Sequence, residues 1–142
     1  MRRSIILDTT ARLVLPSALM LSLYLLFAGH NQPGGGFVGG LVAGAAMALA
    51  YVAGGIDDVR ALVRVRAWTV VGTGLLLAAL TALVPLLSGG SLLEHGIAEL
   101  DPPLLGHVKL TSTLLFDTGV YAVVVGLVLM ALEAFGEEAP TR

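Results

Sequence analysis

The sequence contains no cysteine and few charged residues, and each shortage excludes a class of protein. Without cysteine there is no disulfide, no thiolate metal site and no cysteine nucleophile. Charged side chains make up 13% of the 142 residues, about half of the roughly 25% that is typical of soluble domains. With 8 basic and 10 acidic residues, the formal net charge of −2 offers nothing to a polyanionic partner such as a nucleic acid.

Apolar residues dominate the composition instead. Hydrophobic residues account for 56% of the chain, which also contains 18 glycines. A soluble globule of this length could not bury so much apolar surface, and the same composition excludes disorder. We therefore predict a membrane protein whose length allows a single domain.

Long apolar runs predict four membrane-spanning helices. Each run has about 20 residues with few charges, the length that a helix needs to cross roughly 30 Å of hydrocarbon. The runs are continuous rather than alternating, which excludes lipid-facing strands. We predict an all-α membrane protein, a bundle of four transmembrane helices that forms one domain over residues 13–135. The predicted spans are residues 13–29, 35–55, 67–88 and 112–135.

A short basic segment precedes the first apolar run. Met1, Arg2 and Arg3 followed by apolar residues resemble a secretory signal peptide. The run is long, however, no small-x-small cleavage site follows it, and further apolar runs come after it. We expect it to remain as the first span, preceded by an interfacial N-terminus over residues 1–12.

Basic residues favour one orientation of these spans. They gather on the side that holds both termini and the loop at residues 56–66, whereas the opposite side holds only Lys109. The basic residues on the first side are Arg2, Arg3, Arg12, Arg60, Arg64, Arg66 and Arg142. Because basic residues mark the cytoplasmic side, we predict that both termini, including the tail at residues 136–142, are cytoplasmic. Residues 30–34 and 89–111 would then face outward.

The most distinctive segment is glycine-rich and runs from Gly29 to Gly40. It contains the pattern Gly-x-Gly-x-x-Gly, but a dinucleotide-binding fingerprint needs a strand before it and a soluble amphipathic helix after it. Here both flanks are apolar spans, so we exclude nucleotide binding. Glycine and proline instead allow a tight reversal between the first two spans. The residues of this predicted motif turn are Pro33, Gly34, Gly35, Gly36 and Phe37.

Small residues continue beyond the turn at every fourth position, in Gly36, Gly40, Gly44 and Ala48. Such a ridge lets another helix approach closely, backbone to backbone. The sequence leaves two interpretations open. Either the ridge packs against another helix of this chain, or it packs against a partner subunit.

A polar stripe marks the last span. Lys109, Thr113, Asp117 and Tyr121 are spaced by four, so a helix that begins early enough would place them on one face. An ionisable residue inside a span costs roughly 2.5–3.5 kcal/mol on insertion scales, so Asp117 is by default a candidate for function. The alternative is a carboxylate that reaches the head groups or hydrogen-bonds to a neighbouring helix end.

Other polar residues carry no recognisable catalytic chemistry. His30, His95 and His107 all fall on the predicted outer side, and their spacing matches no metal motif. The hydroxyl residues near the last span lack the histidine and the acid of a catalytic triad. We therefore expect no enzyme, no cofactor and no metal site.

Two motifs together resemble one known family. The segment Gly-His-Asn-x-Pro-Gly-Gly-Gly-Phe-x-Gly-Gly at 29–40 and the segment Leu-Phe-Asp-x-Gly-Val-Tyr at 115–121 are similar to those of the MnhB family. MnhB is the B subunit of Mrp-type sodium/proton antiporters. The resemblance covers roughly residues 9–135, so it implies the same four-span fold for almost the whole chain.

The resemblance implies a small subunit of a hetero-oligomeric antiporter in the bacterial cytoplasmic (inner) membrane, in contact with lipid and with large complex-I-like subunits. The transported ions would be sodium and protons. We hypothesise an ion path or coupling site formed by Asp117, Lys109, Thr113, Tyr121 and His30. The alternatives are a purely structural subunit of that complex, the equivalent membrane-arm subunit of an energy-transducing hydrogenase, and an independent small channel.

Overall fold

The computed structural model describes residues 5–29, 34–87, 97–100 and 108–137. Long helices dominate these ranges, and a short two-stranded ribbon accompanies them. The elements are α1 (Ile5–Ala28), α2 (Gly36–Gly54), α3 (Ile56–Leu62), α4 (Ala67–Leu87), β1 (Ile97–Leu100), β2 (Val108–Thr111) and α5 (Ser112–Glu137).

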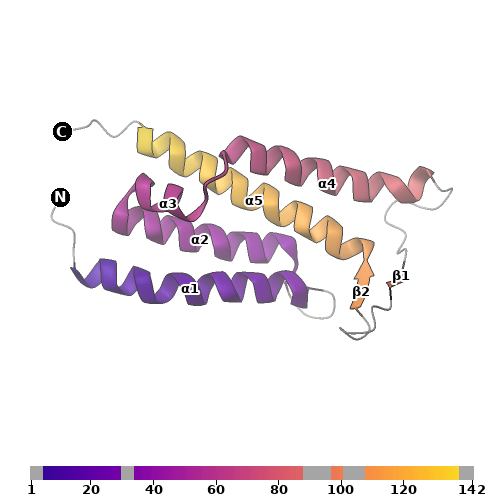
Figure 1. Ribbon diagram of the computed structural model, residues 1–142, viewed down its shortest axis with the longest axis horizontal. Coiled ribbons are helices and arrows are strands. Elements are labelled where there is room, and N and C mark those ends of the chain that lie inside the picture. The colour runs from indigo at the N-terminus through magenta and orange to yellow at the C-terminus, as the bar shows by residue number, and fades with distance from the viewer. Residues whose placement is uncertain (1–4, 30–33, 88–96, 101–107, 138–142) are drawn as a thin grey trace.

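The four long helices lie side by side in a row, in the order α1, α2, α5 and α4 (Figure 1). α2 therefore packs between α1 and α5, and α5 packs between α2 and α4. The prediction of an all-α membrane protein is confirmed: α1, α2 and α5 are each long and apolar enough to cross a membrane. α4 forms a further candidate span together with α3, across a bend of 44° between the two helices.

The helices extend somewhat beyond the predicted spans at both ends of the chain. α1 begins at Ile5 rather than near residue 13, and α5 continues to Glu137. The added first turns of α1 carry an ion pair four residues apart, in which Arg12 Nε lies 3.2 Å from Asp8 Oδ2. The two opposite charges therefore partly neutralise each other on the part of α1 that precedes its apolar run.

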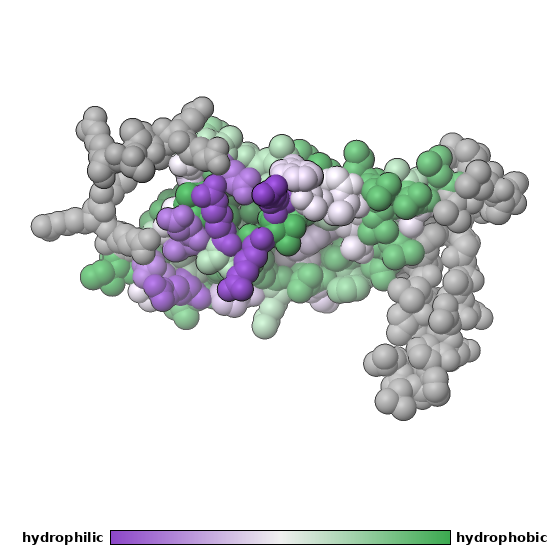
Figure 2. All heavy atoms as spheres, turned by 45° about the horizontal axis from the view of Figure 1, so that its top comes forward, coloured by the Kyte–Doolittle hydropathy of each residue, from purple (hydrophilic) through white to green (hydrophobic). Residues whose placement is uncertain are grey.

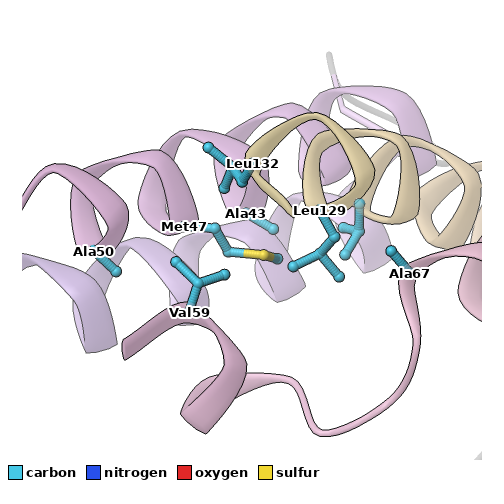
Figure 3. Close-up of a cluster of buried hydrophobic side chains, with 8 residues drawn as sticks. Ala43, Met47, Ala50, Val59, Ala67, Leu129 and Leu132 are labelled. Atoms are coloured by element: carbon cyan, nitrogen blue, oxygen red, sulfur yellow. The ribbon is translucent and has the colours of Figure 1, made fainter. Parts of the chain in front are cut away.

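The short helix α3 folds back against α2 and α5 and contributes Val59 to a cluster of buried apolar side chains. Val59 is 1% exposed. Figure 3 shows these side chains pointing toward one another from α2, α3, α5 and the start of α4. The cluster comprises Ala43, Met47, Ala50, Val59, Ala67, Val125, Leu129 and Leu132. Because most of them are alanine, valine or leucine, the helices approach closely here and bury the cluster without any polar group.

Charged residues gather at one end of the molecule. Figure 2 shows hydrophilic residues gathered over the end that holds α3, and residues of intermediate or hydrophobic character beyond them. The exposed arginines Arg60, Arg64 and Arg66 lie in and just after α3. In Figure 1 the start of α1 and the end of α5 lie at this same end, whereas the start of α2 and both strands lie at the opposite end. The arrangement agrees with the predicted grouping of both termini with the middle loop.

Single-cysteine labelling tests which end faces the cytoplasm, because the chain has no cysteine of its own. Ala61→Cys introduces a thiol on an exposed position of α3, and Ala98→Cys introduces one on β1. We expect a membrane-impermeant maleimide to label Ala61→Cys in everted vesicles and Ala98→Cys in right-side-out vesicles. The reverse pattern would contradict the orientation predicted from the basic residues.

Candidate functional site

The glycine ridge of α2 packs against α5 of the same chain. A Cβ on Gly36 would overlap the backbone carbonyl oxygen of Asp117. A Cβ on Gly40 would lie 2.8 Å from the Cβ of Val124, and one on Gly44 would lie 2.8 Å from a methyl of Val128. Of the two interpretations left open by the sequence, these contacts favour packing within the subunit.

The reversal between α1 and α2 depends on glycine at one position. Gly35 has a φ of +95°, a conformation that side-chain-bearing residues rarely adopt. Its N–H donates a hydrogen bond of 2.9 Å to the carbonyl oxygen of Leu25, which ties the start of α2 to the end of α1. Phe37 follows on the exposed side of α2. Pro33 and His30 lie outside the described residues.

Asp117 lies beside the first turn of α2. Its side chain is half-buried, and a Cβ placed on Gly35 would be 3.4 Å from its Oδ2 atom. Gly35 is the N-cap of α2 and makes no side-chain capping bond. The first N–H groups of a helix lack intrahelical partners and form the positive end of its dipole. The carboxylate is therefore placed where negative charge is favoured, and the two sequence motifs meet at this point.

A second polar contact lies one turn further along α5, at Tyr121. The Tyr121 hydroxyl is 2.9 Å from the hydroxyl of Ser22 on α1. Ser22 is 0% exposed and donates a hydrogen bond of 2.7 Å to the carbonyl oxygen of Gly39 on α2. Three helices are thus joined by two hydroxyl groups. Sequence reasoning missed Ser22 because a single serine in an apolar run has no partner within its own helix.

The predicted polar stripe is shorter in the structure than in the sequence. Thr113, Asp117 and Tyr121 all lie on α5, but this helix does not begin early enough to include Lys109, so Lys109 does not share their helical face. Lys109 belongs to β2, which pairs antiparallel with β1 and places it opposite Glu99. Residues 108–111 include β-branched valine and threonine, which favour a strand, and the helix begins only at Ser112.

The other side of α5 packs equally closely against α4. A Cβ on Gly119 would lie 2.7 Å from the backbone nitrogen of Ala78 and 2.8 Å from the carbonyl oxygen of Gly74. Gly126, two turns further along, faces Val71 in the same way. The glycine of the second motif therefore serves the α4–α5 contact, while its aspartate serves the α2–α5 contact.

Chemically, the site offers one carboxylate and two hydroxyl groups between helices. Within the ranges that the structure describes, no group of three or more histidine, aspartate or glutamate side chains is placed to hold a metal ion. The site can therefore contribute oxygen ligands or a titratable group, and any tighter cation site needs further oxygen atoms from elsewhere.

Comparison with known proteins identifies the family of the chain. Residues 6–130 match the family model described as "Domain related to MnhB subunit of Na+/H+ antiporter". The chain is 41% identical over 134 residues, 94% of each chain, to the B subunit of the Na(+)/H(+) antiporter of Bacillus subtilis (strain 168). It is 36% identical to the corresponding B subunit of Alkalihalophilus pseudofirmus, across 94% of this chain and 93% of that one.

A third relative is the "Putative antiporter subunit mnhB2" of Staphylococcus haemolyticus, which is 35% identical across 92% of each chain. The family match covers α2 and α4 in full, nearly all of α1, and α5 up to residue 130. Several long apolar helices and these relatives together indicate a multi-pass protein of the bacterial cell membrane. The chain therefore belongs to the MnhB family, whose members are related to the MnhB subunit of Na+/H+ antiporters.

Proposed function

We propose that this chain is the B subunit of a multi-subunit Na+/H+ antiporter, and that Asp117 is a cation-binding position on the ion path of that complex. The relatives bear the name of such a subunit over nearly their full length, which supports the first part. The observation that carries the second part is the half-buried Asp117 carboxylate beside the start of α2.

A carboxylate at this depth needs a reason. Placing an ionisable group inside a span costs roughly 2.5–3.5 kcal/mol on insertion scales, so such residues are rare unless they serve transport or pairing. A carboxylate can bind a sodium ion and a proton in turn, which is what exchange through one site requires. Asp117 is also partly exposed, so ions from the surrounding medium or from a partner subunit could reach it.

The remaining ligands of such a cation site would come from other subunits. The start of α5, which carries Asp117, lies at the end of the molecule opposite to α3 (Figure 1). The predicted outer segment before α5 carries the acidic residues Glu94, Glu99 and Asp101. Negative charges at an entrance raise the local concentration of cations. We propose that the path passes between Asp117 and a facing subunit, with no path enclosed by this chain alone.

Replacing Asp117 with asparagine tests the proposal. The amide keeps the size of the side chain but removes its charge and its ability to take up a proton. We expect Asp117→Asn to lower sodium-dependent proton flux at least about tenfold in everted vesicles that contain the whole complex, since loss of a charged ligand typically costs about 1.5–3 kcal/mol. Asp117→Glu should retain part of the activity.

Asp57→Asn is the matched control, because Asp57 is an exposed acid in the first turn of α3, at the far end of the molecule. It should leave both flux and assembly unchanged. Complex formation is followed in parallel on native gels. Normal flux in a fully assembled Asp117→Asn complex would remove Asp117 from the ion path.

A purely structural role is the second candidate, and the edges of the helix row favour it. α1 and α4 expose large side chains, with Met20 73% and Trp68 62% exposed. Partner helices or lipid must cover these surfaces. Purification of the tagged chain from its native membrane distinguishes the assemblies: large transporter subunits support the antiporter, and metal-cluster subunits would instead indicate a hydrogenase arm.

A further inference from the structure

The hydrogen bonds between Ser22, Tyr121 and Gly39 have a fixed direction. Ser22 has one hydroxyl proton, and that proton is donated to the carbonyl oxygen of Gly39 at 2.7 Å. The contact of 2.9 Å between Ser22 and Tyr121 must therefore use the proton of Tyr121. The order is Tyr121 hydroxyl to Ser22 hydroxyl to Gly39 carbonyl.

This order excludes a proton wire through Ser22. A wire needs each acceptor to pass a proton onward, but the last acceptor is a backbone carbonyl inside helix α2. Such an oxygen accepts hydrogen bonds and has no proton to release. These buried hydrogen bonds end at a group that cannot pass a proton on. They are therefore suited to holding the three helices in one arrangement.

Gly36, Gly40 and Gly44 let α5 approach α2 closely. A hydrogen bond adds a restraint of another kind, because it weakens steeply when its angle changes. The Ser22–Tyr121 contact therefore adds an orientation-dependent restraint to the close packing of α2 and α5.

Tyr121 and Asp117 lie one helical turn apart on the same side of α5. A Cβ on Gly39 would lie 3.4 Å from the ring of Tyr121, and one on Gly35 would lie 3.4 Å from Oδ2 of Asp117. Both side chains thus face the same edge of α2, about 6 Å apart along the axis. Any rotation of α5 that breaks the tyrosine contact also moves the carboxylate relative to the start of α2.

We propose that Ser22 and Tyr121 are positioning residues that hold the Asp117 carboxylate in its cation-binding place beside α2. This inference rests on the proposed role of Asp117. Ser22 then contributes to cation affinity, and Tyr121 does not relay protons. The signature of this positioning role is a change in the sodium concentration that gives half-maximal flux, with little change in the maximal rate.

The experiment compares Ser22→Ala, Tyr121→Phe and the double variant in the complete complex in everted vesicles. We expect Tyr121→Phe to raise the half-maximal sodium concentration about fivefold, the effect of one lost hydrogen bond. Ser22→Ala should raise it at least as much, because it also removes the bond to the Gly39 carbonyl. The double variant should be no worse than Ser22→Ala alone, because Ser22→Ala already removes the Tyr121 contact. The maximal rate and its pH profile should stay close to those of the unchanged complex.

Ser17→Ala and Tyr24→Phe are the matched controls. They make the same chemical changes on the exposed side of α1, where the Ser17 hydroxyl bonds only to the Leu13 carbonyl of its own helix. Neither should change the half-maximal sodium concentration. Tyr121→Phe keeps the ring and leaves the Ser22–Gly39 bond in place, so it remains informative if Ser22→Ala lowers the amount of assembled complex.

Each other outcome overturns the inference in a distinct way. Unchanged sodium dependence in assembled Ser22→Ala and Tyr121→Phe complexes, alongside a defective Asp117→Asn complex, would reject the positioning role and leave the proposed function standing. A lower maximal rate with a shifted pH profile and normal sodium dependence would indicate a proton relay. Normal flux in Asp117→Asn would remove the proposed function, and this inference with it.

Discussion

Replacing Gly36 with alanine should separate α2 from α5 and lower the stability of the folded chain by about 3 kcal/mol. The added methyl group would overlap the backbone carbonyl oxygen of Asp117, which cannot move without moving α5. Overpacking in a well-packed interior typically costs about 1–3 kcal/mol, and a clash with backbone belongs at the upper end of that range. The gain in helix propensity from glycine to alanine is at most about 1 kcal/mol, so the clash dominates.

Heating the purified complex before native gel electrophoresis measures this effect. A loss of about 3 kcal/mol lowers the midpoint by roughly 10 °C for a chain of this size. Gly72→Ala is the control, because a Cβ on Gly72 of α4 meets no atom within 4 Å. It should keep the midpoint or raise it slightly. A Gly36→Ala complex as heat-stable as the Gly72→Ala complex would contradict the close α2–α5 contact.

The second large effect is expected at Gly119, on the opposite side of α5. A leucine there would place its Cβ 2.7 Å from the backbone nitrogen of Ala78 and 2.8 Å from the carbonyl of Gly74. The rest of the side chain would have to enter the same contact, so α4 must leave α5. We expect the cost to exceed about 3 kcal/mol and the assembled protein to fall below detection in membranes.

Gly72→Leu is a close control, since it adds the same side chain to α4 at an open position. Immunoblotting of membranes and native gels would compare the two variants. Gly72→Leu should accumulate normally, because an added leucine on an apolar exposed surface suits a membrane. Equal, normal accumulation of both would mean that α4 and α5 do not pack through Gly119.

The membrane character and the helix content followed directly from composition. Long apolar runs predict helices because hydrocarbon leaves every backbone polar group to find its partner within the helix. Helix ends were less well predicted: α1 begins at Ile5, where Asp8 and Arg12 offset each other. Hydropathy locates the part of a helix that lies in hydrocarbon. It does not predict polar turns that extend the helix beyond that part.

Residue patterns identified part of the candidate site. Asp117 and Tyr121 were predicted from a spacing of four, and both face the edge of α2 that holds the glycine-rich motif. The same spacing would include Lys109 only in a helix that begins before Ser112, and backbone pairing with β1 forms a strand there instead. A spacing of four residues places side chains on one helical face only where all of them belong to the same helix.

Contacts between helices were beyond the reach of these patterns. Nothing in the sequence pattern predicted a role for Ser22, a single serine among apolar residues. It is nevertheless fully buried, and its hydrogen bonds join α1, α2 and α5. The motif at 115–121 predicted no partner for Gly119, which packs closely against α4. Each role depends on a partner that is distant in the sequence.

The sequence by itself determined that this protein is a bundle of membrane-spanning helices with small-residue surfaces and one acid near the end of its last span. These are local properties, set by hydrophobicity and by the geometry of a single helix. Only the tertiary structure decided that α2 and α4 pack on opposite sides of α5, that Asp117 lies beside the start of α2, and that Ser22 meets Tyr121. In a membrane, apolar side chains gain little by leaving lipid for one another, so close packing and hydrogen bonds between distant residues choose the partners.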